Sequence, residues 1–452
     1  MTFRNRLRNY IRILAWILLI INVSPAKATL HETTSSDSTL MAYLNELGIE
    51  TTKHNEVKIL KSGHEKFIDL FEQIEKAKHH IHLEYFNFRN DSIANALFDI
   101  LAKKVKEGVE VRAMYDAFGN SSNNRPLKKK HIQSIQERGI EIVKFDPIRF
   151  PWINHVWHRD HRKIVVIDGI IGYTGGMNIA DYYITGLPEI GEWRDMHIRI
   201  EGEAVNNLQD IFLTMWNHCT HQNVGGDAYY PYNKSPLFEP EQKKEIAIVD
   251  RVPKKTNKIM RQVYAKAIES AENKVQIINP YFTPTKSVKK AIKKAVAKGV
   301  NVEIMIPGKS DIGFTPDAAL YIANQLRKKG ANIYIYNGGF HHSKIMMVDS
   351  LYCTVGSTNL NSRSLHYDYE VNAFVFDTET TDSLITIFNQ DKEDSTLLTS
   401  EIYKKRSVPV CCTDLSAPAT RSYSRLAAVN SFIRESRWAS PRISSPHCSE
   451  ST

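Results

Sequence analysis

The sequence has few of the features that mark disulfide-rich, zinc-binding or multispanning membrane proteins. Its five cysteines form no C-x-x-C pair, so neither a disulfide framework nor a zinc site is indicated. It also has no uninterrupted apolar run of the about 20 residues that a membrane-spanning helix needs. No cofactor and no obligatory metal is predicted from these patterns.

The N-terminus is basic and then briefly apolar. Four arginines between residues 4 and 12 precede an eleven-residue, mostly apolar run at 13–23, and small residues follow up to Ala28. These are the parts of a secretory signal peptide, and we expect cleavage after Ala28. A short membrane anchor over 1–28 is the alternative. Both readings keep the arginines in the cytoplasm and send the rest of the chain across the membrane.

Length and charge restrict the remaining possibilities. The chain of 452 residues is long for a single core, which predicts two domains or lobes. Its net charge of +9 fits an anionic partner. Lipid headgroups, nucleic acid and other phosphate compounds all meet that description, so charge alone does not choose among them.

One pattern occurs twice, 181 residues apart. It reads H-x-K-x4-D-x6-G-[GS]-x-N, and matched His, Lys and Asn positions are difficult to explain by packing. The sequence therefore predicts a duplicated active site. The first copy holds His161, Lys163, Asp168, Gly176 and Asn178, and the second holds His342, Lys344, Asp349, Ser357 and Asn359.

The order of predicted elements also repeats. Strand, helix and strand patterns at 81–88, 92–107 and 109–115 return at 275–282, 286–298 and 300–306, with Gly108 and Gly299 ending the two helices. A strand, helix, strand unit predicts parallel pairing. We expect an α/β fold of two homologous halves, each a mostly parallel β-sheet flanked by helices, with the active site at their interface.

The expected boundaries follow from this repeat. After the signal peptide or anchor (1–28) comes a leading segment (29–55), then one half at 56–245 and the other at 246–380. The remainder, 381–452, is rich in Ser, Arg and Pro and lacks periodicity from about residue 390, so it is predicted to be a tail, largely disordered beyond that point.

The motif has a predicted local geometry. Residues 161–167 alternate like a strand, which puts His161 and Lys163 on one face. Asp168 and Gly169 form a two-residue hairpin signal, which would place His161 opposite Gly176 and Asn178 on the same face. In the second copy Ser357 would face His342. Asp168 and Asp349 are candidate catalytic residues, with turn formation or a structural hydrogen bond as the alternative.

These side chains suit a phosphodiester. Lys163 and Lys344 supply positive charge to phosphate oxygens, while Asn178, Ser357 and Asn359 supply neutral donors, with no metal ligand required. One imidazole attacks phosphorus and the other protonates the leaving alkoxide, so we expect their pKa values to be pushed apart.

A nucleophilic imidazole also needs its second nitrogen held by an acceptor. Each half offers a later carboxylate in a strand-like context, Asp195 and Glu370. A surface or hairpin charge is the alternative interpretation of both.

The motif resembles the H-x-K-x4-D signature of the phospholipase D superfamily, and its surroundings resemble bacterial cardiolipin synthases most. The matching runs are 80–86, 161–178, 193–202, 279–282 and 342–370, and the resemblance covers about 56–380. It implies a covalent phosphohistidine, with His161 as nucleophile and His342 as the acid and base. A synthase of this kind transfers a phosphatidyl group from one phosphatidylglycerol to another and releases glycerol.

The resemblance also implies a location, the bacterial cell membrane, and we expect the catalytic body on the exported side. Members of this branch commonly begin with two membrane-spanning helices, whereas this chain has one short apolar run. Contact with the membrane surface is therefore expected through a peripheral basic patch, such as residues 128–130 or the lysines of 289–294. Solvated loop and helix faces are the alternative for both.

Two other functions stay open. The site could use water, as a hydrolytic phospholipase D or a nuclease, or the chain could bind lipid without catalysis. All six His, Lys and Asn positions are intact, which argues against a lost activity. The two copies in one chain favour anionic phospholipid over nucleic acid, because compact nucleases of this superfamily generally carry one copy and dimerise. The sequence does not decide between water and alcohol as acceptor.

Overall fold

The computed structural model describes residues 35–147, 157–233, 243–313 and 315–406. The expected signal peptide or anchor, the start of the leading segment and the tail from residue 407 lie outside the described residues. Within the described ranges, no helix is long and apolar enough to cross a membrane.

The first half is built on a seven-stranded sheet with the strand order β1-β8-β6-β5-β2-β3-β4. Its strands are β1 (Asn55–Leu60), β2 (His80–Tyr85), β3 (Glu110–Asp116), β4 (Glu141–Phe145), β5 (Lys163–Ile167), β6 (Ile171–Gly175) and β8 (His197–Gly202). Its helices are α3 (Gly63–Lys76), α4 (Ser92–Lys106), α5 (Ala117–Ser122), α6 (Lys129–Glu137), α7 (Tyr182–Thr185) and α8 (Ala204–Thr220).

The second half is built on an eight-stranded sheet with the order β17-β12-β11-β10-β14-β15-β16-β9. Its strands are β9 (Glu245–Arg251), β10 (Lys274–Ile278), β11 (Asn301–Pro307), β12 (Asn332–Tyr336), β14 (Ile345–Val348), β15 (Tyr352–Gly356), β16 (Glu370–Phe376) and β17 (Ser395–Leu397). Its helices are α9 (Ile259–Ser270), α10 (Lys286–Ala297), α11 (Thr315–Arg327), α12 (Ser362–His366), α13 (Thr378–Glu393) and α14 (Ser400–Arg406).

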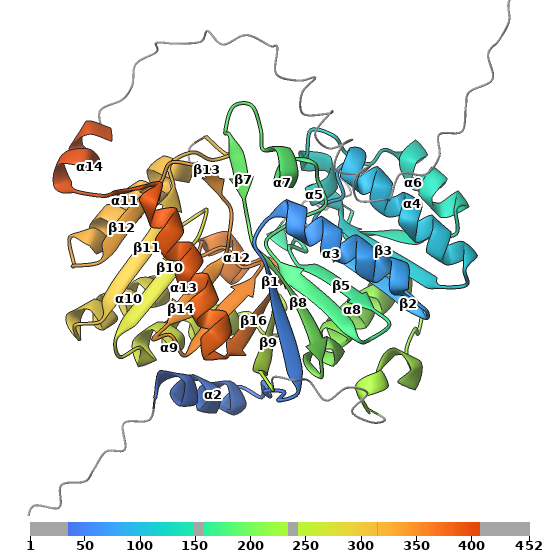
Figure 1. The fold of residues 1–452 in the computed structure, drawn as a ribbon, viewed down its shortest axis with the longest axis horizontal. Coiled ribbons are helices and arrows are strands. Elements are labelled where there is room, and N and C mark those ends of the chain that lie inside the picture. Colours follow the sequence, from blue (N-terminus) through green and yellow to red (C-terminus); the bar gives the residue numbers. More distant parts are fainter. Residues whose placement is uncertain (1–34, 148–156, 234–242, 314, 407–452) are drawn as a thin grey trace, which may run out of the picture. The chain divides into compact units, whose positions relative to one another are not determined.

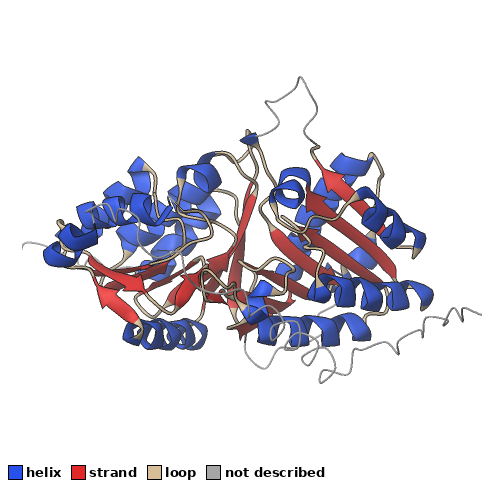
Figure 2. Ribbon diagram, turned by 90° about the horizontal axis from the view of Figure 1, so that it is seen from above, coloured by secondary structure: helices blue, strands red, loops and turns tan. Residues whose placement is uncertain are grey.

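The seven strands of the first sheet match seven of the second in order, and β17 is added at the edge of the second sheet, which confirms the predicted α/β fold of two homologous halves (Figure 1). The strand, helix, strand units pair in parallel, β2 with β3 and β10 with β11, as predicted. The motif strands β5 and β14 join these units antiparallel. In the first sheet, β1, β2, β3, β4 and β6 run in one direction, and β5 and β8 run in the other. Helices flank the strands (Figure 2).

The helix ends follow local sequence signals. The side chain of Asp91 accepts a hydrogen bond from the backbone N–H of Ala94 and caps the start of α4. Gly108 and Gly299 follow the ends of α4 and α10 with φ of 90° and 91°, a conformation that glycine adopts without a steric penalty. The predicted helix stops are therefore confirmed.

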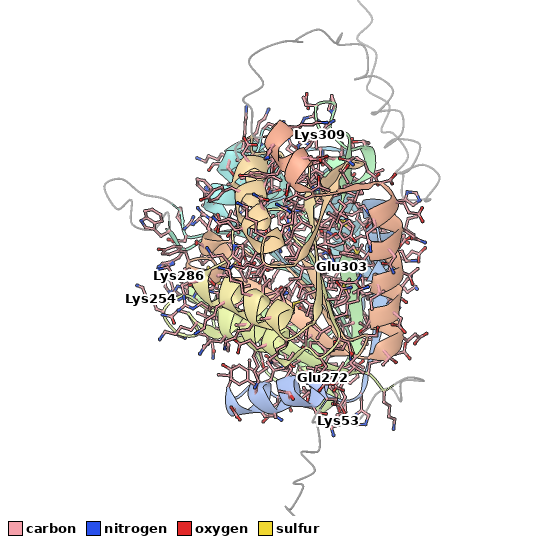
Figure 3. The ribbon with its side chains drawn as sticks, turned by 90° about the vertical axis from the view of Figure 1, so that its left-hand side faces the viewer. Lys53, Lys254, Glu272, Lys286, Glu303 and Lys309 are labelled. Atoms are coloured by element: carbon pink, nitrogen blue, oxygen red, sulfur yellow. The ribbon has the colours of Figure 1, made fainter. Side chains whose placement is uncertain are left out.

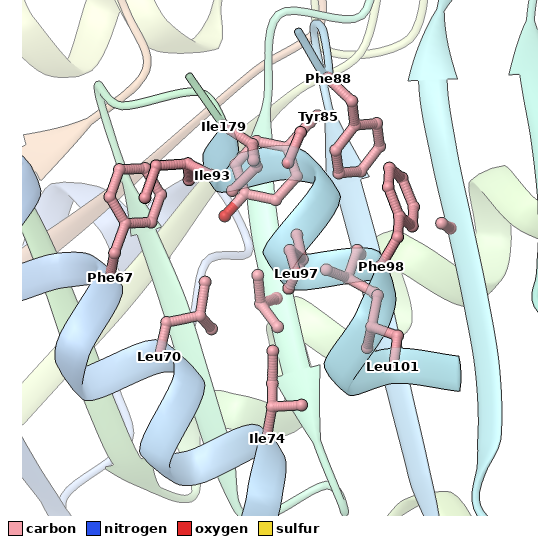
Figure 4. Packing of buried hydrophobic residues seen from close by; sticks show 14 of the residues in the cluster. Phe67, Leu70, Ile74, Tyr85, Phe88, Ile93, Leu97, Phe98, Leu101 and Ile179 are labelled. Atoms are coloured by element: carbon pink, nitrogen blue, oxygen red, sulfur yellow. The ribbon is translucent and has the colours of Figure 1, made fainter. Parts of the chain in front are cut away.

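The cores join the layers. In the first half, α3 and α4 pack apolar side chains on β2, and Figure 4 shows Leu70, Leu97 and Phe88 in this cluster. A second cluster is shared by the two sheets, since it contains Ile164 of β5 and Ile345 of β14. This shared core buries apolar surface between the halves, so they pack together and are not two separate domains joined by a linker.

A short parallel ribbon also links the halves. Strand β7 (Glu192–Arg194) belongs to the first half by sequence and β13 (Gly339–His341) to the second, and they pair with Arg194 opposite His341. The leading segment contributes α2 (Ser36–Glu46), whose Leu40 and Leu44 pack in the core of the second half.

The prediction of a tail from 381, disordered beyond about 390, is wrong for residues 381–406. Helix α13 spans Thr378–Glu393, β17 pairs antiparallel with β12, and α14 follows. Composition did not reveal the order of this segment, because α13 has few apolar residues. Leu384, Ile387 and Phe388 nevertheless lie together on one buried face of the helix.

The predicted hairpin register is wrong by one residue. Ile167 pairs with Ile171, so three residues lie between the strands, and His161 precedes β5 instead of facing Gly176. The second copy has the same shift, since Val348 pairs with Tyr352. The physical reason is the role of the turn aspartate, which adopts a positive φ of 55° and whose carboxylate binds another segment.

Asp168 and Asp349 are structural residues in this arrangement. The carboxylate of Asp168 accepts hydrogen bonds of 2.8–3.0 Å from the backbone N–H groups of residues 78–80 at the start of β2. Asp349 accepts the equivalent bonds from residues 272–274 at the start of β10. Both lie at the far end of the motif strands from the histidines, so the structural alternative replaces the candidate catalytic role.

Replacing Asp349 by Ala is predicted to lower the free energy of unfolding by about 2 to 4 kcal/mol, because three backbone N–H groups lose a charged acceptor. Urea unfolding followed by circular dichroism measures the change. Asp382→Ala, at an exposed position of α13, is the control and should change the free energy by less than about 0.5 kcal/mol. Equal losses in the two variants would contradict the structural role.

Candidate active site

The first motif histidine is held by the second half. The backbone N–H of His161 donates to the carbonyl of Tyr369 at 3.1 Å. Its Nδ1 lies 3.1 Å from Oε1 and 3.2 Å from Oε2 of Glu370, the first residue of β16. Adjacent residues of the second half therefore fix both the backbone and the ring, which leaves Nε2 for chemistry.

The second motif histidine is held by the first half in the same way. The backbone N–H of His342 donates to the carbonyl of Arg194 at 2.6 Å, and its Nδ1 lies 2.7 Å from Oδ2 of Asp195. Asp195 and Glu370 thus each lie against Nδ1 of the histidine of the other half. The site is complete only where the two halves meet, which fits its predicted place at their interface.

The two motif lysines are buried beside the histidines. The ammonium group of Lys163 donates to the carbonyl of His161 at 2.6 Å, and that of Lys344 donates to the carbonyl of His342. Burial lowers the pKa of Lys163 to about 7 and that of Lys344 to about 8. Because an adjacent anion favours the charged form, a bound phosphate group would raise both values and hold the lysines as cations.

Burial also sets the protonation of the histidine and carboxylate pairs. It lowers the pKa of both His161 and His342 well below the ordinary value, so these two imidazoles change in the same direction and the expected divergence is not seen. Burial raises the pKa of Glu370 to about 7 and that of Asp195 to about 6. Because each imidazole contacts a carboxylate, the two groups of a pair are coupled in their titration.

The two halves differ at one position beside the carboxylates. Ser357 does not face His342: its hydroxyl donates to Glu370 and accepts from the backbone N–H of Val371 at 3.0 Å. The prediction that Ser357 binds phosphate is therefore corrected to a role in positioning Glu370. A side chain at Gly176, its counterpart, would meet the carboxylate of Asp195, with a Cβ only 2.2 Å from Oδ1. The glycine therefore leaves room for that carboxylate.

The two motif asparagines are buried with free hydrogen-bonding capacity. In the described part of the chain, Oδ1 of Asn178 and Oδ1 of Asn359 have no hydrogen-bond partner. The side-chain nitrogen of Asn178 makes one long contact, 3.5 Å to the hydroxyl of Tyr183. Buried amides normally have partners, so both oxygens are open to a hydrogen bond from a ligand donor, whereas a phosphate oxygen would need the side-chain nitrogens of these asparagines as donors.

Aromatic rings surround the imidazoles. The ring of Phe86 lies edge-on to His161 at 5.1 Å between centroids, and Trp193, Tyr281 and Phe340 lie 5.2–5.9 Å from His342. These apolar walls reduce solvation of the imidazoles, which accounts for their lowered pKa values. Among the described residues, no group of three or more His, Cys, Asp or Glu side chains is placed to hold a metal ion.

One buried residue of the site escaped the sequence analysis. Asp391 on α13 binds both strands of the ribbon between the halves: its carboxylate lies 2.9 and 3.1 Å from the guanidinium of Arg194 and 2.9 Å from Nε2 of His341. Arg194 and His341 immediately precede Asp195 and His342. Asp391 therefore fixes the ribbon from which the second imidazole and its carboxylate emerge.

The sequence held one usable signal for this residue. Asp377 caps α13, and apolar residues recur at helical spacing up to Phe388, one turn before Asp391. His341 points toward Asp391. Burial raises the pKa of Asp391, but the bond from His341 and the charge of Arg194 bring it below the ordinary value.

Comparisons with known proteins agree with this geometry. The family model described as "Cardiolipin synthase, PLD-like domain" matches residues 70–216 and 264–392. A cardiolipin synthase of Oceanobacillus iheyensis is 38% identical over 361 residues, 79% of this chain and 73% of the relative. The major cardiolipin synthase ClsA of Bacillus subtilis is 38% identical over 356 residues, 78% of this chain and 72% of the relative.

A solved structure shares the fold. The phosphatidylserine synthase of Haemophilus influenzae superposes with a TM-score of 0.59 at 15% identity, over 84% of this chain and 94% of the other. The two-sheet fold with paired His and Lys residues between its halves defines an enzyme of the phospholipase D superfamily. Within that superfamily, the chain belongs to the cardiolipin synthase family.

Replacing Asp391 by Asn is predicted to lower kcat by about ten- to a hundredfold on a phosphodiester substrate with little change in KM, because the His342–Asp195 pair loses its fixed position. Asp391→Glu should recover part of the rate, and Asp382→Asn on the same helix should behave as wild type. A fall in melting temperature with unchanged kcat in the folded fraction would reduce Asp391 to a purely structural residue.

Proposed function

We propose that this enzyme makes cardiolipin by transferring a phosphatidyl group from one phosphatidylglycerol to another, with release of glycerol. The observation that carries the chemistry is the pair of imidazoles, each held through Nδ1 by a buried carboxylate of the opposite half. The names of the relatives that match most of the chain support the substrates.

In the first step Nε2 of His161 attacks phosphorus of the donor lipid. The bond from phosphorus to the glycerol headgroup oxygen breaks, and the electron pair goes to that oxygen, which takes a proton from Nε2 of His342. Glycerol leaves, and a phosphatidyl group stays on His161. The negative charge of the bound phosphodiester raises the pKa of the His342–Asp195 pair and so supplies the proton.

In the second step His342, now neutral, removes a proton from the terminal hydroxyl of the second phosphatidylglycerol. The hydroxyl oxygen attacks phosphorus, the bond from phosphorus to Nε2 breaks, and its electron pair returns to His161. The product is cardiolipin, and both histidines regain their starting protonation. Water in place of the second lipid would give phosphatidic acid.

Two features support His161 as the nucleophile. Its side chain is 14% exposed and that of His342 is 7% exposed, so His161 is the more accessible imidazole. Ser357 donates to Glu370 and favours the ionised carboxylate, which stabilises the positive charge that His161 gains on attack.

The remaining polar groups stabilise charge in the transition state. Lys163 and Lys344 face the phosphate as cations, and the side-chain N–H groups of Asn178 and Asn359 act as neutral donors to its oxygens. Removing one such preorganised donor from an enzyme typically costs about 3 to 4 kcal/mol of transition-state stabilisation. We propose no metal in this scheme, because two lysines supply the positive charge.

We also propose that the enzyme works at the bacterial cell membrane, with its catalytic body on the exported side. The basic and apolar N-terminus supports export, and the net charge of +9 supports binding to anionic lipid. The expected cleavage after Ala28 and the alternative of a short anchor are tested by N-terminal sequencing of the mature protein.

The direct test is incubation of the purified protein with labelled phosphatidylglycerol in detergent micelles containing a chelator. We expect cardiolipin and glycerol as products, and loss of turnover by a factor of about 10³ or more in His161→Ala. Phosphatidic acid as the sole product would make the enzyme a hydrolytic phospholipase D. No lipid turnover would contradict the proposal and favour a phosphodiester of nucleic acid or a non-catalytic lipid-binding role.

The pH dependence tests the role of Ser357. Uptake of a proton by the His161–Glu370 pair blocks attack, so kcat/KM should fall as the pH drops below about 7. The hydroxyl of Ser357 lowers the pKa of Glu370, so Ser357→Ala should raise it and move the acid limb to higher pH by about 0.5 to 1 unit. Exposed Ser362→Ala is the control; an unmoved limb in Ser357→Ala would exclude this role.

A further inference from the structure

Two large aromatic side chains are exposed next to the active site. Trp157 is 59% exposed and Tyr367 is 43% exposed, and their ring centroids lie 5.9 Å apart. They are anchored to the site itself, because Nδ1 of His158 lies 2.9 Å from the carbonyl of Tyr367, and the carbonyl of Tyr369 accepts from His161. In the described part of the chain few large apolar side chains are this exposed, and two of them touch each other here.

Cations adjoin this aromatic pair. The ring of His366 lies 6.1 Å from that of Tyr367, and the guanidinium of Arg261 contacts His366. Arg261 lies in the first turn of α9 and follows a basic segment, 252–258, that connects β9 to α9 and contains Lys254, Lys255 and Lys258, all exposed.

The basic segment is attached next to Tyr367 of the aromatic pair, and its positive charges are close together in sequence. Arg251 at its start donates to the carbonyl of Asp368. No Asp or Glu occurs between residues 251 and 268, so no acidic residue of the segment itself offsets the lysines. Lys254 lies on the same side of Figure 3 as Lys286 at the start of α10. Arg363 is also near, but it is paired with Asp368 at 3.0 Å and is not counted as a free cation.

We propose that this surface, here called the rim patch (Trp157, Tyr367, Lys254, Lys255, Lys258 and Arg261), docks the enzyme on an anionic lipid bilayer. Tryptophan and tyrosine have an apolar body and a polar end, and they settle at the boundary between headgroups and acyl chains. Lysine and arginine beside them are attracted by anionic headgroups.

The proposal rests on the proposed function and deepens it, since it names the face through which substrate enters. A lipid that leaves the leaflet at the aromatic pair would do so beside the segments that hold His161, since His158 contacts Tyr367 and His161 contacts Tyr369. Nucleic acid also attracts cations and aromatic rings. It is disfavoured because the two rings touch each other, whereas a strand needs separated ring faces on which successive bases stack.

Co-sedimentation of the full-length protein with vesicles tests the rim patch without requiring turnover. Wild type should bind vesicles of phosphatidylglycerol mixed with phosphatidylcholine, and bind phosphatidylcholine alone weakly. Trp157→Ala/Tyr367→Ala and Lys254→Glu/Lys255→Glu/Lys258→Glu should each weaken binding to the anionic vesicles by about tenfold or more. Melting temperatures close to wild type would show that the variants are folded.

Matched controls carry the same changes elsewhere. Tyr321→Ala removes a tyrosine that is 58% exposed on α11, and Lys76→Glu/Lys103→Glu/Lys106→Glu reverses three exposed lysines of α3 and α4. Both should bind vesicles as wild type does. Equal losses in the triple variants would show that only net charge matters and would overturn the proposal.

A second readout locates the contact. Phosphatidylglycerol brominated on its acyl chains should quench the tryptophan fluorescence of wild type and quench Trp157→Phe less. Equal quenching of both proteins would contradict docking through Trp157, as would displacement of the protein from vesicles by a single-stranded oligonucleotide that binds the rim patch more tightly. Vesicle binding through the rim patch without lipid turnover would leave the docking intact and refute only the proposed reaction.

Discussion

The structure depends on an exchange of carboxylates between its two halves. Glu370 of the second half holds His161 of the first, and Asp195 of the first half holds His342 of the second, at 3.1 and 2.7 Å. The backbone repeats the exchange through the carbonyls of Tyr369 and Arg194. Neither half alone orients its own imidazole, so duplication and interface are conditions for a working site.

The shared core between the sheets makes this exchange rigid. The apolar cluster that joins β5 and β8 with β9, β10 and β14 to β16 leaves the halves little freedom to separate. On one side the ribbon of β7 and β13, bound by Asp391, fixes the position of the His342–Asp195 pair. On the other side the hydroxyl of Ser357 donates a hydrogen bond to Glu370 and positions it, whereas the first half has Gly176 at the equivalent place. The duplicated site is therefore not symmetric, which is what two steps with different roles for each histidine require.

The sequence predicted the parts of the account that depend on spacing. These parts are local patterns whose spacing predicts the structure directly. They are the strand, helix, strand units, the helix ends at Gly108 and Gly299, and the two H-x-K motifs. The orienting function of Asp195 and Glu370 was also predicted, although their crossed pairing was not, because it depends on how the halves pack. Contacts between residues 147 and 209 positions apart leave no periodic trace in a single sequence.

The incorrect predictions have physical reasons too. The hairpin register failed because the carboxylate of Asp168 binds backbone N–H groups of another strand and adds a residue to the turn, which turn chemistry alone does not reveal. Residues 381–406 were expected to form part of a tail, yet a single buried face on α13 and pairing of β17 with β12 are enough to order them. Asp391 was missed for the same reason, since it lies in that segment.

The measurement that tests the crossed pairing most directly is the burst of p-nitrophenolate from a p-nitrophenyl phosphodiester of diacylglycerol. This leaving group needs no acid, so the burst reports attack by His161 and the slow phase reports release from it. Crossed pairing predicts that Glu370→Gln removes the burst, while Asp195→Asn keeps the burst and slows the later phase. The reverse pattern, or equal effects on both phases, would contradict the account.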